Sequence, residues 1–146
     1  MAIKIEKIGR YDDFTKPSIQ VVTDETGKKT SYDYVGIESN GLRPIRIKND
    51  CGYIDAKTGK EVCNRIYSWT DNFCNGIAAV KFGKEFWIVN TNLDPIIQEG
   101  FHDAAEVMGR VMVRKDNKLG FIEIKDDGNY FVNYYGKAVG TYNSTF

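Results

Sequence analysis

A pattern that recurs every 33 to 35 residues constrains the fold of this 146-residue chain more than any other feature. Each copy has a glycine, then an apolar strand-like run, and a second apolar run that begins eleven residues after the glycine. The three glycines are Gly41, Gly76 and Gly109. A period of this length is typical of repeat proteins, in which every copy supplies one supersecondary unit.

Each copy is predicted to form a strand, a turn and a second strand. Short polar segments separate the two apolar runs, and polar clusters rich in Gly, Asp, Asn or Pro follow each second run, at 55–61, 90–95 and 125–129. Such residues favour tight turns. The best helical candidate, 101–113, aligns with the strands of the other copies. We therefore expect an all-β fold of tandem antiparallel β-hairpins that form a twisted sheet, a barrel or a short solenoid.

The repeats predict a single domain over residues 1–146. An N-terminal cap with a half-repeat should span 1–31, and an aromatic C-terminal cap should span 129–146. Between them we expect three repeats, at 32–66, 67–100 and 101–128. Terminal units of repeat arrays are commonly irregular because they cap the stack.

The copies resemble the WG-repeat (KWG) family. Its unit of about 35 residues combines a G-L-A-x-V strand, a G-K-W-G-F-I-D hairpin and a D-x-x-G-K turn. This frame is filled by the segments 41–62, 76–90 and 109–124, so the resemblance covers roughly residues 18–128. The usual tryptophan is replaced in every copy, by Cys51, Phe86 and Leu119. The resemblance implies a β-hairpin repeat fold, transfers no catalytic residue and points to binding rather than chemistry.

Composition excludes some classes of function. Twenty basic and twenty acidic side chains cancel, which argues against a surface that binds phosphate or anionic membranes as a whole but leaves a local patch open. The first residues lack the apolar core of a signal peptide, and every apolar run is far shorter than about 18 residues. We expect a cytoplasmic protein that does not contact membranes, with its three cysteines reduced.

Alternation along the first strand of each copy predicts a buried position followed by a basic one. The buried position holds Ile45, Val80 and Val113, and the next residue, which points to the opposite face, is Arg46, Lys81 or Arg114. If the copies stack in register, these cations form a row, with Arg43 and Arg110 nearby. The row is either a solvated face that discourages aggregation or a stripe that binds an acidic protein surface or a phosphate backbone.

The sequence contains no clear motif for metal binding or catalysis. Cys51, Cys63, Cys74 and His102 are too widely spaced for a common metal motif, so we expect no metal site. The paired carboxylates lie in predicted loops, at Asp12-Asp13, Asp24-Glu25 and Asp126-Asp127. The pattern therefore predicts no catalytic residue and no cofactor. Rings that could stack on bases gather near the C-terminus, at Tyr130, Phe131, Tyr134, Tyr135 and Tyr142.

We therefore expect a non-enzymatic protein-binding module. It would act as an adaptor, or as an inhibitor that covers a partner protein's site, for example a phage-type inhibitor of bacterial defence. The alternative is a nucleic-acid-binding module that uses the basic stripe and the C-terminal aromatic residues. An enzyme would need a cleft that the sequence does not predict, and exposed strand edges would also allow self-association.

Overall fold

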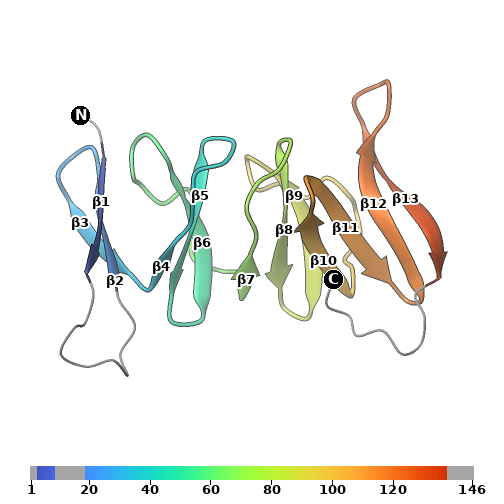
Figure 1. Cartoon of the computed structure of the whole chain (residues 1–146), viewed down its shortest axis with the longest axis horizontal. Helices are drawn as coiled ribbons and strands as arrows, with labels where there is room; N and C mark the ends of the chain where they lie inside the picture. The colour runs from blue at the N-terminus through green and yellow to red at the C-terminus, as the bar shows by residue number, and fades with distance from the viewer. Residues whose placement is uncertain (1–2, 9–18, 138–146) are drawn as a thin grey trace. The chain divides into compact units, whose positions relative to one another are not determined.

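The computed structural model describes residues 3–8 and 19–137, which form β-strands, turns and loops and contain no helix (Figure 1). Within these residues, thirteen strands pair antiparallel in four separate sheets. The predicted all-β fold of tandem hairpins is confirmed. None of the four sheets closes on itself, so the barrel and the single continuous sheet are wrong for the described residues. These residues also include no helix that could cross a membrane.

The chain divides into two compact units, Met1–Ser68 and Trp69–Phe146. The first unit holds two three-stranded sheets. One sheet consists of β1 (Lys4–Ile8), β2 (Ile19–Thr23) and β3 (Lys29–Tyr32). The other consists of β4 (Tyr34–Val35), β5 (Leu42–Ile47) and β6 (Asp50–Asp55). The hairpin of the first predicted repeat is therefore β5 and β6.

The second unit holds a three-stranded and a four-stranded sheet. The smaller sheet consists of β7 (Trp69–Thr70), β8 (Ile77–Phe82) and β9 (Glu85–Asn90). The larger sheet consists of β10 (Asp103–Val107), β11 (Arg110–Lys115), β12 (Lys118–Ile124) and β13 (Tyr130–Lys137). The predicted C-terminal cap therefore contributes β13, which pairs with β12 in the sheet of the third repeat.

The three repeat glycines lie in two-residue turns that precede β5, β8 and β11. The residue before each glycine and the glycine itself both have positive φ, with values of 54° and 85° at Asn40 and Gly41. Two consecutive positive φ angles characterise the type I′ turn, whose second position favours glycine. The periodic glycine is thus a turn residue, and the turn starts each hairpin.

The third copy departs from this turn chemistry at Met108. Its φ is 53°, while the equivalent residues are Asn40 and Asn75, which tolerate positive φ far better than methionine does. The Met108 side chain is 95% exposed, so little packing is lost when it is replaced.

We expect Met108→Asn to raise the free energy of unfolding by about 0.5–1 kcal/mol, because it removes backbone strain from the turn. Urea unfolding would measure the change. Met108→Ala also removes the methionine side chain, but alanine does not tolerate positive φ as asparagine does. This variant should therefore give no comparable increase in the free energy of unfolding. Equal gains from both variants would contradict this account.

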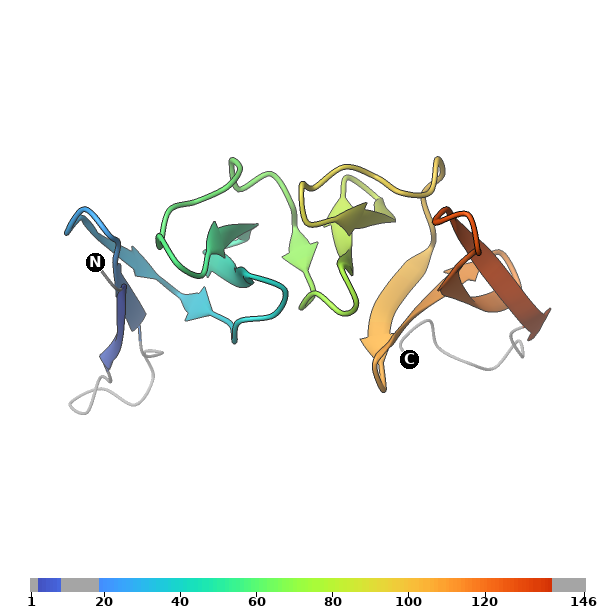
Figure 2. The same ribbon diagram turned by 90° about the horizontal axis from the view of Figure 1, so that it is seen from above.

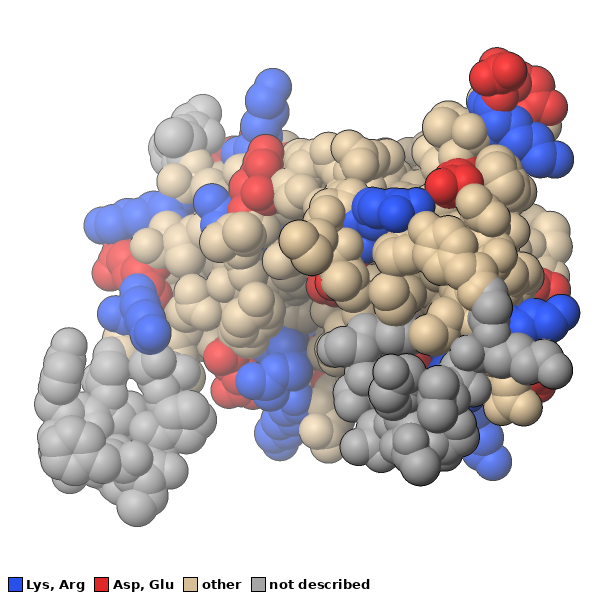
Figure 3. All heavy atoms as spheres, turned by 45° about the vertical axis from the view of Figure 1, so that its right-hand side comes forward, with Lys and Arg blue, Asp and Glu red and all other residues tan. Residues whose placement is uncertain are grey.

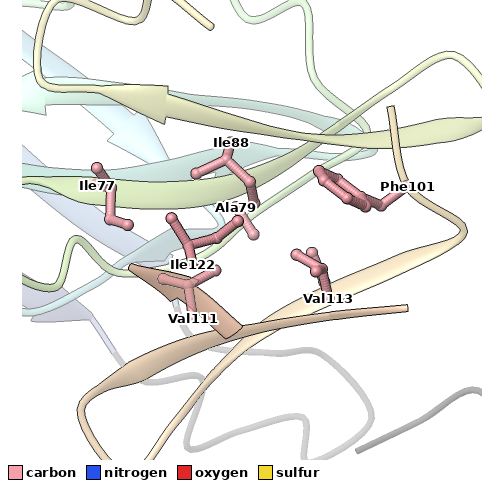
Figure 4. Packing of buried hydrophobic residues seen from close by; sticks show 8 residues of the cluster. Ile77, Ala79, Ile88, Phe101, Val111, Val113 and Ile122 are labelled. Atoms are coloured by element: carbon pink, nitrogen blue, oxygen red, sulfur yellow. The ribbon is translucent and has the colours of Figure 1, made fainter. Parts of the chain in front are cut away.

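Each hairpin has two faces, which we define by position after the repeat glycine. The forward face carries positions 1, 3 and 5 and their cross-strand partners, and the back face carries positions 2, 4 and 6. In the second unit the forward face of β8 and β9 packs on the back face of β11 and β12. Figure 2 shows the ribbon of the chain from above. Seven of the residues in this core are labelled in Figure 4: Ile77, Ala79, Ile88, Phe101, Val111, Val113 and Ile122.

The first unit has its own core between its two sheets. Val22 and Tyr32 of the first sheet contact Val35, Ile45 and Ile54 of the second. The three predicted core positions are fully buried, at Ile45, Val80 and Val113, so that prediction is confirmed. Alternation along the strands therefore identified the buried positions in both units.

Tyr32 is the largest polar side chain of the first core. It is 2% exposed, and its hydroxyl donates to Oε2 of Glu61 at 3.1 Å, which also accepts from Nη1 of Arg65 at 2.8 Å. Burial, followed by the charge of Glu61, raises the pKa of Tyr32 to about 12. A raised tyrosine pKa means that the neutral hydroxyl favours the folded state.

We expect the Tyr32 contribution to stability to be complete below about pH 10 and to be lost as the pH rises towards about 12, the folded pKa. Replacing Glu61 by glutamine removes a negative charge and should lower the pKa of Tyr32, although burial still holds it above the usual value. Burial also raises the pKa of Tyr67 and of Tyr134, so ultraviolet absorbance titration should show several late-titrating tyrosines, of which the Tyr32 component moves to lower pH in the variant. An unchanged titration curve would contradict the role of Glu61.

Candidate functional site

The structure places the two predicted binding residues of the first unit on opposite faces of β5. Arg46 is exposed on the forward face, and its Nη1 donates to the carbonyl of Lys48 at 2.8 Å. Arg43 is half-buried on the back face, and its Nη1 donates to the carbonyl of Gly36 at 3.0 Å. Both guanidinium groups therefore hold backbone carbonyls of their own chain.

The second unit brings two of its three predicted residues together. Arg110 and Arg114 lie on the forward face of β11, whereas Lys81 lies on the forward face of β8, with its Nζ 5.4 Å from the ring centroid of Phe86. The β10–β13 sheet separates Lys81 from the two arginines, because the forward face of one copy packs on the back face of the next. A single row across one face does not form in this unit, and a binding role for these cations stays a prediction.

Arg110 and Arg114 belong to a mixed surface, which we call the terminal face. It is the forward face of the β10–β13 sheet, the last sheet in chain order. Its centre is apolar, and its charged groups stand at the two ends. The twelve residues are Asp103, Ala105, Val107, Arg110, Met112, Arg114, Leu119, Phe121, Glu123, Phe131, Asn133 and Tyr135.

Phe121 forms the centre of the terminal face. It stands opposite Met112 in the sheet register. The Cζ atom of Arg110 lies 3.9 Å from the centroid of the Phe121 ring, and the Tyr135 ring centroid lies 5.1 Å from it. A cation above a ring and a neighbouring tilted ring stabilise each other beyond simple burial. These contacts hold the Arg110 side chain flat over the sheet.

Ion pairs neutralise the cations of the terminal face. Nη2 of Arg110 lies 3.1 Å from Oε1 of Glu123, whose other oxygen accepts from Asn133 at 3.0 Å. At the opposite end, Nη2 and Nε of Arg114 donate to Oδ2 of Asp103 at 3.0 and 3.2 Å. The Arg114–Asp103 pair is part-buried, whereas the Arg110–Glu123 pair is more exposed. Exposed surface pairs contribute about 0–1 kcal/mol each, so the main effect of the Arg110–Glu123 pair is to fix the charge pattern.

The corresponding face of the second copy is a packing surface. Ile77, Ala79 and Ile88 are 5%, 1% and 0% exposed there, and the same repeat positions hold Arg110, Met112 and Phe121 in the third copy. The terminal face is thus a copy of an internal contact surface that has gained charged ends. Sequence reasoning missed this face because it treated the side opposite the core as solvated. The alignment of Phe121 with Ile88 could have indicated that this face is a contact surface.

Charges of both signs lie next to one another on the surface drawn in Figure 3, without a continuous basic area. A hollow of about 430 Å³ opens beside the terminal face, where Arg110, Glu123 and Tyr130 meet Cys74 and Ile77. Its lining combines the ion pair between Arg110 and Glu123 with apolar side chains such as Val111 and Ile122.

The remaining candidates are the cysteines, His102 and the paired carboxylates. All three cysteines are free, and burial raises the pKa of the Cys51, Cys63 and Cys74 thiols, which makes them poor nucleophiles. The described residues include no group of three potential metal ligands. Nδ1 of His102 accepts from the backbone amide of Asp116 at 3.1 Å and so supports a turn. Three of the predicted residues, Asp12, Asp13 and Tyr142, lie outside the described residues.

No family model, curated protein or solved structure was found to match this chain.

Proposed function

We propose that this chain is a non-enzymatic protein-binding module and that its terminal face contacts the partner. The observation that carries the proposal is the arrangement around Phe121, an apolar centre bordered by ion-paired arginines. Protein interfaces commonly combine an apolar core with a polar rim, and their energetic hot spots are enriched in Tyr, Trp and Arg. Such a surface fits an adaptor, or an inhibitor that covers a site on its partner.

Two further expectations belong to this proposal. Membership of the WG-repeat family rests on the repeat pattern and on the hairpins that realise it. A cytoplasmic location rests on the three free cysteines, since reduced thiols are typical of that compartment.

Nucleic acid binding is the second candidate, and a specific observation favours it. Cations lie near two rings of this sheet, with Nζ of Lys118 5.7 Å from the centroid of exposed Tyr134 and Nζ of Lys125 5.8 Å from the centroid of half-buried Phe131. Bases stack on such rings in single-strand binding proteins. The proposal nevertheless favours a protein, because carboxylates already neutralise Arg110 and Arg114.

The test is affinity capture of the tagged chain from its native lysate, with and without nuclease. We expect a nuclease-resistant protein partner that Phe121→Glu weakens by at least about 30-fold, the effect of losing a central hot spot. Ile37→Glu is the matched control, because Ile37 is an exposed isoleucine outside the strands, and it should leave capture unchanged.

A second variant separates the terminal face from the other predicted cations. The double change Arg46→Glu and Lys81→Glu alters two basic residues that lie elsewhere and should leave capture intact. Loss of capture in this variant alone would move the site to those cations. A nuclease-sensitive partner with a steep salt dependence would support the nucleic-acid alternative.

A further inference from the structure

Both units follow one packing rule. In the second unit the forward face of one sheet contacts the back face of the next. The first unit does the same, because Val22 and Tyr32 on the forward face of the first sheet contact Ile45 and Ile54 on the back face of the second. Val22 lies two residues before Asp24, as Tyr53 lies two residues before Asp55. Tyr53 is on the forward face because it pairs with Pro44, so Val22 is assigned to the forward face as well.

The sheets also stack in register, because equivalent turns of successive copies touch. In the first unit the amide of Glu25 donates to the carbonyl of Thr58 at 2.9 Å, and Nζ of Lys60 lies 3.5 Å from Oε1 of Glu25. In the second unit Sγ of Cys74 and Nδ2 of Asn75 donate to the carbonyl of Gly109 at 2.8 and 3.3 Å. Face and register are therefore both fixed at the two junctions.

Two faces belong to the first and the last sheet of the described residues, and neither takes part in the two junctions above. One is the terminal face, and the other is the back face of the β1–β3 sheet, which we call the initial face. The initial face has an apolar centre and a charged end, and its residues are Lys4, Glu6, Ile8, Ile19, Val21, Thr23, Lys29 and Ser31.

From this rule we infer that a second copy of this chain occupies the terminal face and docks there through its initial face. The inference rests on the proposed function, because it names the occupant of the same site. A forward face would again meet a back face, so the contact between copies repeats the junction that each unit already contains. Leu119 and Phe121 would meet Ile19 and Val21 of the second copy.

Charges support this occupant. The ion pair between Glu25 and Lys60 links two turns in the first unit, and both turns close with the same backbone bond, from Asp24 N to Lys28 O and from Asp55 N to Lys60 O. The last turn closes from Lys125 N to Asn129 O, which puts Asp126 at the position of Glu25. Lys28 occupies the position of Lys60. At a junction between copies, exposed Asp126 would thus face exposed Lys28.

The contact is head-to-tail, so each copy uses two different surfaces. Such an association does not close after two copies unless the rotation between them forms a ring. The zero net charge of the chain imposes no overall repulsion between copies. We therefore expect concentration-dependent assembly rather than a fixed dimer.

Sedimentation velocity of the full chain over a concentration series tests the inference. The wild type should sediment faster as concentration rises, whereas Phe121→Glu and Val21→Glu should each remain monomeric. An equimolar mixture of these two variants keeps one intact terminal face and one intact initial face, so it should form a 1:1 pair that does not grow. Ile37→Glu should behave like the wild type.

A charge exchange checks the register without altering the apolar centre. Asp126→Lys should weaken assembly up to about fivefold, as expected for an exposed pair, and adding Lys28→Asp to the same chain should restore it. Failure of the exchange to restore assembly would overturn the proposed register. If Phe121→Glu does not fold, the Asp126→Lys variant and the exchange with Lys28→Asp still test the contact between copies.

A wild type that stays monomeric over the whole series would overturn the inference. Assembly that persists in both single variants would overturn it as well, because it would place the contact on strand edges. The proposed function and this inference can be distinguished. If the wild type is monomeric and captures a foreign protein that Phe121→Glu loses, the proposed function stands and the second copy is not the occupant.

Discussion

Replacing Phe101 by alanine should lower the free energy of unfolding by about 3–5 kcal/mol, the range for removing a fully buried aromatic side chain. Phe101 is 0% exposed and lies in the core between the β7–β9 and β10–β13 sheets (Figure 4). Its backbone exchanges two hydrogen bonds with Phe86, of 2.9 and 2.8 Å, so the residue cannot easily shift to fill the cavity. The loss therefore includes both transfer and cavity terms.

Urea unfolding of the two proteins would measure this change. Phe82→Ala is the matched control, because Phe82 is a phenylalanine of the same unit that is 53% exposed, and its loss should cost less than about 1 kcal/mol. Similar losses in the two variants would contradict the core described here. A small loss in Phe101→Ala alone would mean that the two sheets can close over the cavity.

The hairpins and their buried positions could be predicted from the sequence because both depend on local patterns. Alternation has a period of two in any strand, so Ile45, Val80 and Val113 were identified without knowledge of the fold. The recurring spacing then aligned strands and turns between copies. Both signals survive substitution, since Cys51, Phe86 and Leu119 remain mostly apolar at one shared position.

The orientation of the faces could not be predicted in this way. Alternation says that neighbouring residues point apart, but it does not say what covers either side. On β8 both sides are covered, as Ala78 at 0% and Ala79 at 1% exposure show. If one face of each hairpin were core and the other solvated, Arg46, Lys81 and Arg114 would lie together in one row on the solvated face. Within the second unit, the packing of one sheet face on the next instead puts Lys81 and Arg114 on different layers.

The terminal face was missed for the same reason. Its central residue, Phe121, lies on the side of the hairpin that was expected to be solvated, although it aligns with buried Ile88. Its significance comes from chain order, because the third copy is followed by β13 in the same sheet rather than by another hairpin. That distinction depends on strand pairing, which a repeat alignment does not contain.

Gly120→Ala should destabilise the protein by about 1–3 kcal/mol, the usual cost of overpacking. A Cβ at this position would stand 2.9 Å from the carbonyl oxygen of Asn133 and 3.1 Å from Cα of Tyr134, both backbone atoms of β13. Backbone atoms cannot rotate away as a flexible side chain can. The strand would have to move, and the register between β12 and β13 is already irregular between Lys118 and Gly120.

The same repeat position in the first copy provides the control. A Cβ at Gly52 would meet Cγ of Arg65 at 3.4 Å and Sγ of Cys63 at 3.6 Å, which are ordinary contact distances. Gly52→Ala should therefore be neutral or slightly stabilising, because alanine loses less backbone entropy than glycine on folding. Equal effects of the two variants in urea unfolding would contradict the close approach of β13.

Gly120→Ala also separates fold from function at the terminal face. Displacement of β13 would move Tyr135 away from Phe121, because Tyr135 lies on that strand and its ring is held only 5.1 Å away. Partner capture should then fall in Gly120→Ala while Gly52→Ala retains it, although neither substitution changes a side chain of the face. Retained capture in a destabilised Gly120→Ala protein would show that β13 does not contribute to binding and would confine the site to β10–β12.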